Sequence, residues 1–207
     1  MDALIVDYGM GNLRSVANAL ATLGCEPRVS ANPEDARSAA RIILPGVGAF
    51  GDAMGRLRSS GWVEVLQEEV RVKTKPFLGL CLGMQLLAGT STEHGEHAGL
   101  GWVPGTVVRL DPGDPGLHVP HMGWNTVRAL KTNGLLAGIP EGSTFYFVHS
   151  YVFRCQDPSA VSGLCEYGVE FPATLERGNL FATQFHPEKS QRAGLQLLRN
   201  FLAVPCR

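Results

Sequence analysis

The sequence lacks any run of lysine or arginine. Its 18 basic residues nearly balance 19 acidic ones, and the formal net charge is −1. Proteins that bind nucleic acid or an anionic membrane depend on long-range attraction from a basic surface. We therefore expect small molecules or proteins as partners, and neither nucleic acid nor a membrane.

Long apolar runs and paired cysteines are also missing. No stretch approaches the ~18 apolar residues of a membrane-spanning helix, and "MDALIVDYGM" has no basic region before its short apolar run. The five cysteines are odd in number and contain no C-x-x-C pair: Cys25, Cys81, Cys155, Cys165 and Cys206. This usage fits reduced thiols better than a disulfide framework or a zinc site, so a cytoplasmic protein is expected.

The length bounds the domain count. A chain of 207 residues that is 44% hydrophobic suffices for one sizeable domain and is short for two. We find no repeat, low-complexity tract or linker. A single domain over residues 1–207 is the expectation.

The pattern of apolar residues predicts an α/β fold. In the first half, the strand-like runs "ALIVD", "RIILPG" and "KPFLGL" alternate with the helical spacing of 12–24 and 61–71. This alternation predicts a mostly parallel sheet with helices on its faces. After residue 100, "TVVRL", "STFYFVHSYVFRC", "LCEYGVEFPATLE" and "NLFATQF" predict strands that are antiparallel or mixed with the first sheet, and "AGLQLLRNFLAV" predicts a closing helix.

Cys81 lies where an apolar run ends and a helical pattern begins, within "GLCLG" (79–83). This is a G-x-C-x-G form of the nucleophile elbow, in which flanking residues without a Cβ let a tight strand-to-helix turn close. A thiol at a helix start is favoured as the reactive thiolate. The alternative is a small buried cysteine that only packs.

His186 and Glu188 offer a base and its orienting group. They follow the apolar run of "LFATQFHPEKS", and Pro187 disfavours helical geometry at His186. In an extended segment, residues two apart point the same way, so imidazole and carboxylate can lie side by side. An exposed turn is the alternative for these three residues. Together with the elbow, the segment indicates a Cys-His-Glu triad.

Two other motifs compete for a function. Gly46, Gly48 and Gly51 satisfy G-x-G-x-x-G, but the end of the next strand, where the acidic ribose ligand of a dinucleotide site belongs, is Cys81. These glycines fit better a loop that brings backbone N–H groups to a substrate. The histidine pairs at 94 and 97 and at 118 and 121 lie in Gly- and Pro-rich sequence without ligand partners, so solvated loops are favoured over a metal site.

The residues resemble a known family, the class I glutamine amidotransferases. "PGVGAFGDAM", "GLCLGMQLL" and "FATQFHPEKS" are similar to its oxyanion loop, nucleophile elbow and His-x-Glu motif, in the same order. "DYGMGNLRSV", "PHMGWN" and "FYFVHSY" resemble one branch, the glutaminase subunits of imidazole glycerol phosphate synthase in histidine biosynthesis. The likeness extends over nearly the whole chain.

The resemblance implies a flavodoxin-like domain and a glutaminase without a cofactor or metal. Cys81 would attack the carboxamide of glutamine, His186 would act as acid and base, and Glu188 would orient the ring. The backbone N–H groups of Val47 and Leu82 would form the oxyanion hole. The residues implied to line the glutamine site are Gly48, Gln85, Glu93, His149, Ser150 and Tyr151. Read alone, Gln85 fits a helix surface and Tyr151 a core.

The resemblance also implies a partner, a separate (β/α)8 cyclase subunit that receives the ammonia. Ammonia must pass between the subunits without escaping to bulk water, so the site should open toward a sealed contact. Candidate docking residues are Asn12, Met122, Trp124, Asn125 and Lys189, because Met and Trp bring large apolar area. The alternative places Trp124 in the core of a β-hairpin.

Three other functions stay open at this point. The chain could be the glutaminase subunit of another amidotransferase, a stand-alone thiol hydrolase of the protease or amidase kind, or a regulatory binding module without turnover. A binding module has no need of all three triad groups. A stand-alone hydrolase would not respond to a partner and its ligand.

Overall fold

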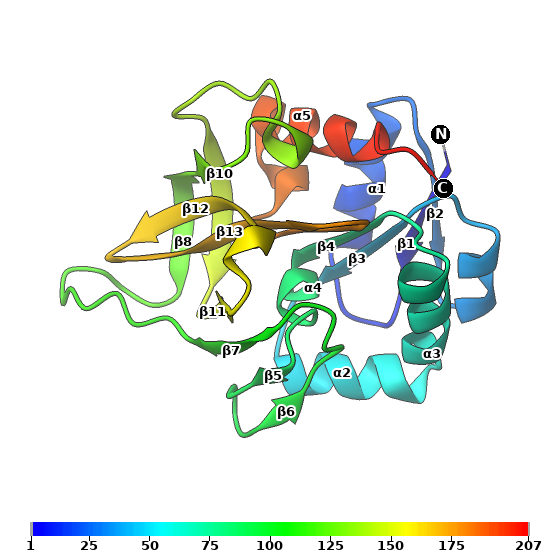
Figure 1. The fold of residues 1–207 in the computed structure, drawn as a ribbon, viewed down its shortest axis with the longest axis horizontal. Helices are drawn as coiled ribbons and strands as arrows, with labels where there is room; N and C mark the ends of the chain where they lie inside the picture. Colours follow the sequence, from blue (N-terminus) through cyan, green and yellow to red (C-terminus); the bar gives the residue numbers. More distant parts are fainter. Residues whose placement is uncertain (1, 207) are drawn as a thin grey trace.

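The computed structural model describes residues 2–206 and is organised around an eight-stranded sheet with the order β2-β1-β3-β4-β14-β13-β12-β9 (Figure 1). Neighbouring strands from β2 to β14 pair in parallel, and the others pair antiparallel. The strands are β1 (Asp2–Val6), β2 (Glu26–Ser30), β3 (Ile42–Gly46), β4 (Phe77–Cys81), β9 (Arg128–Ala129), β12 (Val161–Tyr167), β13 (Val169–Arg177) and β14 (Leu180–Thr183).

Helices cover both faces of this sheet because its inner strands are apolar on both sides. Along β1, Leu4 and Val6 belong to one buried cluster and Ala3 and Ile5 to the other, as the two-residue period of a strand requires. α1 (Leu13–Ala21) and α5 (Gln191–Leu202) cover one face, and α2 (Phe50–Ser59) and α3 (Trp62–Leu66) the other (Figure 1). None of the helices between residues 2 and 206 is long and apolar enough to cross a membrane.

The run "STFYFVHSYVFRC" divides at Ser150 between two smaller sheets. β10 (Thr144–His149) pairs antiparallel with β8 (His121–Thr126). β11 (Tyr151–Cys155) pairs antiparallel with β7 (Gly105–Arg109), which continues to β5 (Thr90–Ser91) and β6 (His97–Ala98). The turn between β10 and β11 therefore lies where the two sheets meet.

The shorter helical segments connect these strands. They are α4 (Leu82–Gln85), η1 (Pro33–Arg37), η2 (Gln67–Val72), η3 (Gly134–Leu136), η4 (Pro158–Ala160) and η5 (Pro187–Lys189). The segment predicted as one helix over 61–71 begins as α3 and widens into the π-helical turn η2. Glu69 of η2 is fully buried, and its carboxylate lies 2.7 Å from the ammonium groups of both Lys73 and Lys75.

The α/β fold class predicted from the apolar pattern is confirmed. For the strands after residue 100, the sequence left open whether they are antiparallel or join the first sheet, and the structure shows both. "NLFATQF" supplies β14, which lies parallel to β4 within the first sheet, while β12 and β13 extend that sheet antiparallel. Helix α2 was not predicted, since Gly51 and Gly55 lower its helix propensity. Its first N–H, that of Phe50, is satisfied by the distant carboxylate of Glu93 at 2.7 Å.

Close packing requires glycine at two positions of the turn from β4 to α4. A Cβ on Gly83 would overlap the carbonyl oxygen of Leu44 in β3, and a Cβ on Gly79 would overlap the carbonyl of Gly83. Both obstacles are backbone atoms, which cannot move as a flexible side chain can. The elbow closes only because neither position carries a side chain.

Gly83→Ala should therefore destabilise the fold by about 3 kcal/mol, as overpacking against fixed backbone does. Gly55→Ala is the matched control: nothing lies within 4 Å of its Cβ, and it is exposed within α2, so alanine should stabilise by about 0.5 kcal/mol. Urea unfolding of the two variants measures both effects. Equal stabilities would contradict the steric account of the elbow.

Candidate active site

Three neighbouring parallel strands bring the predicted triad to one edge of the sheet. In the register of β3 with β4, Gly46 lies opposite Cys81, and in that of β14 with β4, Thr183 lies opposite Leu80. The carboxyl ends of parallel strands meet at the same edge, where open α/β sheets form their sites. The loop after β3, Cys81 and the segment after β14 are thus adjacent.

Cys81 adopts the backbone conformation of a nucleophile elbow, with φ 53° and ψ −106°. A positive φ in a residue with a side chain is strained and persists only where its surroundings enforce it. The residue is 7% exposed, and its Sγ lies 3.9 Å from the carbonyl oxygen of Val148 and 3.8 Å from Nε2 of Gln184. Helix α4 is a single turn, shorter than the helical pattern after Cys81 predicted.

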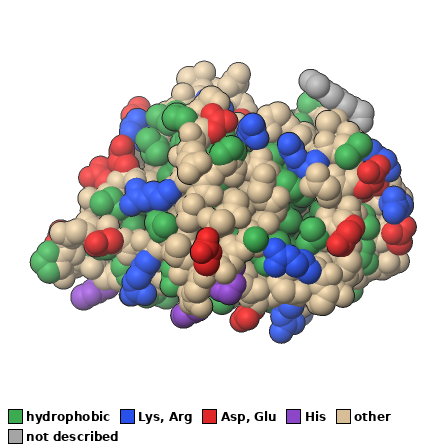
Figure 2. Space-filling model, turned by 60° about the horizontal axis from the view of Figure 1, so that its bottom comes forward, with side chains coloured by type: hydrophobic (Ala, Val, Ile, Leu, Met, Phe, Trp, Pro, Cys, Tyr) green, Lys and Arg blue, Asp and Glu red, His purple; other side chains and the backbone are tan. Residues whose placement is uncertain are grey.

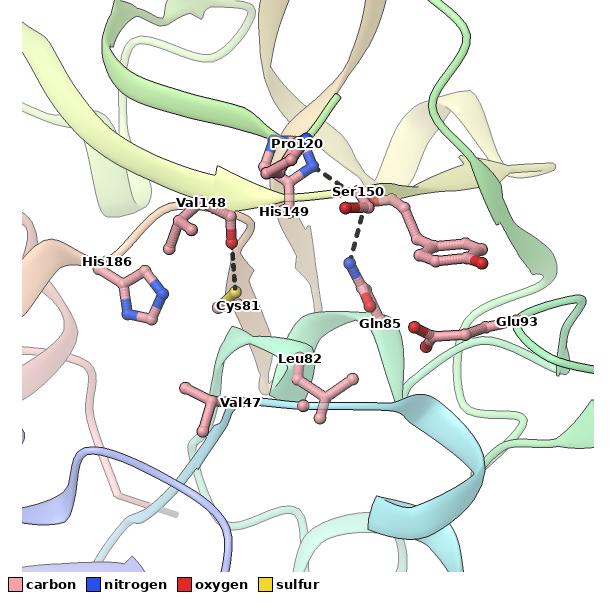
Figure 3. Close-up of a pocket in the computed structure, with 12 residues that line it drawn as sticks. Val47, Cys81, Leu82, Gln85, Glu93, Pro120, Val148, His149, Ser150 and His186 are labelled. Carbon is pink, nitrogen blue, oxygen red and sulfur yellow. Dashed lines mark hydrogen bonds between the residues drawn. The ribbon is translucent and has the colours of Figure 1, made fainter. Parts of the chain in front are cut away.

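His186 and Glu188 lie as an imidazole–carboxylate pair, with Nδ1 of the ring 2.8 Å from Oε1 of the acid. The expectation of an extended segment through both residues was wrong. His186 is extended, as a residue before proline is, but Pro187 starts the 3₁₀ turn η5, and that turn brings Glu188 back under the ring. Within residues 2–206 the other ring nitrogen, Nε2, makes no hydrogen bond. A ring nitrogen faces the sulfur of Cys81 (Figure 3).

The neighbours of His186 stabilise its charged form. Burial on its own lowers the pKa of this imidazole, but the adjacent sulfur of Cys81 and the carboxylate of Glu188, which accepts from Nδ1, raise the pKa to about 10. The ring is therefore an imidazolium at neutral pH, beside the sulfur of Cys81. This arrangement can supply a thiolate nucleophile and a proton donor together.

Burial disfavours the charged form of three other cysteines. Burial raises the pKa of Cys25, Cys155 and Cys165, that of Cys165 to about 12. A thiol with a raised pKa stays protonated at neutral pH and is a poor nucleophile. Cys81, in contrast, lies beside the charged imidazole of His186 (Figure 3).

A cavity of about 400 Å³ opens between these groups (Figure 3). It is lined by Val47, Gly48, Cys81, Leu82, Gln85, Glu93, Pro120, Val148, His149, Ser150, Tyr151 and His186. Every residue that the sequence pointed to for the oxyanion hole and the glutamine site is among them, while Glu188 lies behind His186. Gln85 and Tyr151 belong to this cavity and not to a helix surface or a closed core.

Sequence reasoning missed Pro120, Val148 and Gln184. Pro120 and Val148 come from segments whose place depends on how the two smaller sheets pack. Gln184 precedes His186 by two residues after a strand, so the alternation of an extended chain could have pointed it toward Cys81.

The cavity wall carries one carboxylate and several hydrogen-bonding side chains among its described residues. Glu93 is 9% exposed and, among the described lining residues, supplies the carboxylate of the wall. Gln85 donates from Nε2 to the carbonyl oxygen of Tyr151 and to Oε1 of Gln184, both at 3.0 Å. Gly48 has a φ of +95°, a conformation that residues with a side chain rarely adopt, so the loop after β3 favours glycine at this position.

Three of the predicted docking residues lie on β8, and they divide between its two faces. Met122 and Trp124 are 61% and 48% exposed on one face, so a core position for Trp124 is wrong. The Trp124 ring lies 5.9 Å from that of Tyr146, which also has Nζ of Lys189 5.6 Å from its centroid. Asn125 points to the opposite face, because successive residues of a strand alternate, and donates to the carbonyl of Glu166.

Asn12, the remaining docking candidate, precedes α1 and accepts a hydrogen bond from the hydroxyl of Ser15 at 2.9 Å. α1 packs beside η5, the turn that carries Lys189.

On the face of the molecule in Figure 2, acidic and basic side chains are interspersed over the surface. Within residues 2–206, no three His, Cys, Asp or Glu side chains gather as metal ligands would.

Comparison with known proteins identifies the family. The model of the family "Glutamine amidotransferase class-I" matches residues 4–204. Imidazole glycerol phosphate synthase subunit HisH of Moorella thermoacetica is 51% identical over 197 residues, 95% of this chain and 92% of that protein. The HisH subunit of Rhodospirillum rubrum is 48% identical over 210 residues, 98% of each chain.

Likeness in structure supports the same fold. A crystal structure of a glutamine amidotransferase superposes with a TM-score of 0.73 over 96% of both chains, at 22% sequence identity. The near full-length identity to HisH subunits is much higher. This chain belongs to the class I glutamine amidotransferase family and, within it, to the family of imidazole glycerol phosphate synthase HisH subunits.

Proposed function

We propose that this chain hydrolyses glutamine at Cys81 and delivers the ammonia to a cyclase partner in imidazole glycerol phosphate synthesis. The observation that carries the proposal is the meeting of Cys81 with the charged imidazole of His186 in a cavity of about 400 Å³. Glu188 holds that imidazole from the far side at 2.8 Å. The family membership of the chain supports the same activity.

In the first half of the reaction, the thiolate of Cys81 attacks the carboxamide carbon of glutamine. The carbonyl π electrons move to oxygen, and the N–H groups of Val47 and Leu82 stabilise the oxyanion. Leu82 is the first residue of α4, so its N–H has no acceptor within that helix. The C–N bond then breaks, the nitrogen takes a proton from His186, and ammonia leaves a glutamyl thioester.

In the second half, the now neutral His186 takes a proton from water, and the hydroxide attacks the thioester carbon. The C–S bond breaks, Cys81 returns as a thiolate beside the imidazolium, and the new carboxylic acid releases its proton to water to give glutamate. Glu188 contributes by orienting the ring and stabilising its positive charge. Each half therefore uses one proton transfer by the same nitrogen.

Recognition of glutamine follows from the cavity wall. The α-ammonium group of glutamine needs an anionic partner, and Glu93 presents the carboxylate of the cavity wall. Oε2 of Glu93 already accepts from the N–H of Phe50, which fixes the side chain at the start of α2. Gly48, Gln85 and the segment His149–Tyr151 complete the substrate site.

The partner in this proposal is a (β/α)8 cyclase subunit that docks on the surface formed by Met122, Trp124, Tyr146 and Lys189, with Asn12 nearby. Met and aromatic residues are enriched at interfaces, and Met122 and Trp124 are both exposed. The stand-alone amidase and another amidotransferase subunit are separated from this proposal by one assay. Glutamine hydrolysis should rise when the cyclase and its nucleotide ligand are added, and unchanged hydrolysis would overturn the proposed partner.

Cys81→Ala should lower glutamine-dependent synthesis by the complex by at least about a thousandfold, because no thioester can form. Synthesis from added ammonium salt should continue near the wild-type rate, since the substitution removes only the ammonia source. Product formation with each nitrogen donor measures both. Substantial glutamine hydrolysis by the variant would overturn the assignment of Cys81.

The raised pKa of His186 predicts where activity falls at high pH. The imidazolium is present below about pH 10 and is lost above it, so kcat/KM for glutamine should decline only as the pH rises through about 10. Glu188→Gln keeps an acceptor for Nδ1 but removes the negative charge. The decline should move to lower pH, with a smaller loss of rate than in His186→Ala. A decline at the same pH in both proteins would contradict a role of the charge.

Trp124→Ala should weaken binding to the cyclase about tenfold or more while leaving the melting temperature of the isolated chain unchanged, because half of this side chain is exposed. Val72→Ala is the control, an exposed apolar side chain on η2 that should change neither property. Titration calorimetry and thermal unfolding give the two readouts. A destabilised variant with full affinity would remove Trp124 from the docking surface.

A further inference from the structure

Two buried histidines lie directly opposite each other on β8 and β10. His121 and His149 are register partners of that antiparallel pair and are 3% and 7% exposed. Nδ1 of His121 is 3.0 Å from Nε2 of His149. The proposed reaction assigns no role to His121.

The direction of each hydrogen bond through this histidine pair is set by the carbonyl group at one end of the chain. The carbonyl oxygen of Tyr151 can only accept, so Nδ1 of His149, at 3.0 Å, carries the proton. Nε2 of His149 is then an acceptor, and Nδ1 of His121 must donate to it. The free acceptor of His121, Nε2, faces the amide Nδ2 of Asn125 at 3.3 Å, which can only donate.

The same carbonyl connects this chain of hydrogen bonds to the nucleophile. Hydrogen bonds from His149 and from Gln85 meet at one oxygen, that of Tyr151 (Figure 3). Gln85 also donates to Oε1 of Gln184, whose Nε2 donates to Sγ of Cys81 at 3.8 Å. The chain therefore runs without a gap from Asn125 on β8, through the cavity wall, to the reactive sulfur.

The surroundings keep both rings neutral, which this chain requires. The His121 ring stacks between those of Phe147 and Tyr167, with centroids 4.8 and 4.2 Å away. Burial lowers the pKa of His121 to about 4 and that of His149 to about 3. A proton added to Nε2 of His149 would remove the acceptor that His121 needs, so each ring holds a single proton, on Nδ1.

We propose that His121 and His149 are positioning residues for glutamine, whose fixed Nδ1–H tautomers orient the Tyr151 carbonyl and, through Gln85 and Gln184, the wall of the site beside Cys81. This inference rests on the proposed function, because it assigns the cavity to glutamine. His121 acts entirely through His149, without lining the cavity itself. His121 contributes through the hydrogen bond that it donates to His149, more than through the volume of its ring.

The first test reads the tautomers directly. In the ¹⁵N-histidine-labelled full-length chain without glutamine, long-range ¹H–¹⁵N spectra should show both rings protonated on Nδ1, the opposite of the Nε2–H form that neutral imidazole favours in water. The single variants His121→Phe and His149→Phe assign the signals. An Nε2–H form on either ring in the folded protein would overturn the proposal.

The second test separates the hydrogen bond from the packing. His121→Phe keeps a stacked ring but removes the donor, whereas His121→Asn loses the ring but retains an N–H donor at the position of Nδ1. In the complex with the cyclase, KM for glutamine should rise about tenfold in His121→Phe, the order expected when a buried acceptor loses its donor, with kcat changed less. His121→Asn should stay within about threefold of the wild-type KM despite a lower melting temperature.

His118→Phe is the matched control, because His118 is exposed and its side chain lies outside the chain of hydrogen bonds; KM should not change. A KM that follows the melting temperatures of the His121 variants, or an unchanged KM in His121→Phe, would overturn the proposal. Failure of the wild-type complex to hydrolyse glutamine would instead overturn the proposed function. The tautomers, recorded without glutamine, still decide whether the two rings are oriented as inferred.

Discussion

The parallel pairing of β4 with β3 on one side and β14 on the other is the constraint on which the site depends. The register places Gly46 opposite Cys81, and Thr183 opposite Leu80, so the loop after β3 and the segment leading to His186 leave the sheet beside the nucleophile. Gly83 lets α4 pack directly onto the Leu44 carbonyl of β3. The position of each reactive group is therefore set by backbone hydrogen bonds, which are stiffer than side-chain contacts.

Burial has different consequences at neighbouring imidazoles, and the difference lies in the partner. His186 is next to a carboxylate and the sulfur of Cys81, so its charge is stabilised and its pKa is raised. His121 and His149 are next to aromatic rings and to each other, so burial lowers their pKa values and keeps them neutral. One ring can then transfer protons while the other two hold a fixed hydrogen-bond direction.

Two smaller sheets close the cavity from outside the first sheet. The division of one long apolar run at Ser150 sends β10 to one small sheet and β11 to the other, and the turn between them forms a wall of the cavity. The same β8 strand that presents Met122 and Trp124 outward presents His121 and Asn125 inward. The exposed surface and the site thus share a strand.

The sequence by itself determined the features whose causes are local. The Gly-x-Cys-x-Gly turn follows from the absence of a Cβ at 79 and 83, and the extended His186 follows from Pro187. Tertiary structure alone decided that Glu93 completes the start of α2, that Asn125 turns away from Trp124, and that His121 meets His149. These depend on strand register and on contacts between segments far apart in the chain, where a shift of one residue reverses which side chains share a face.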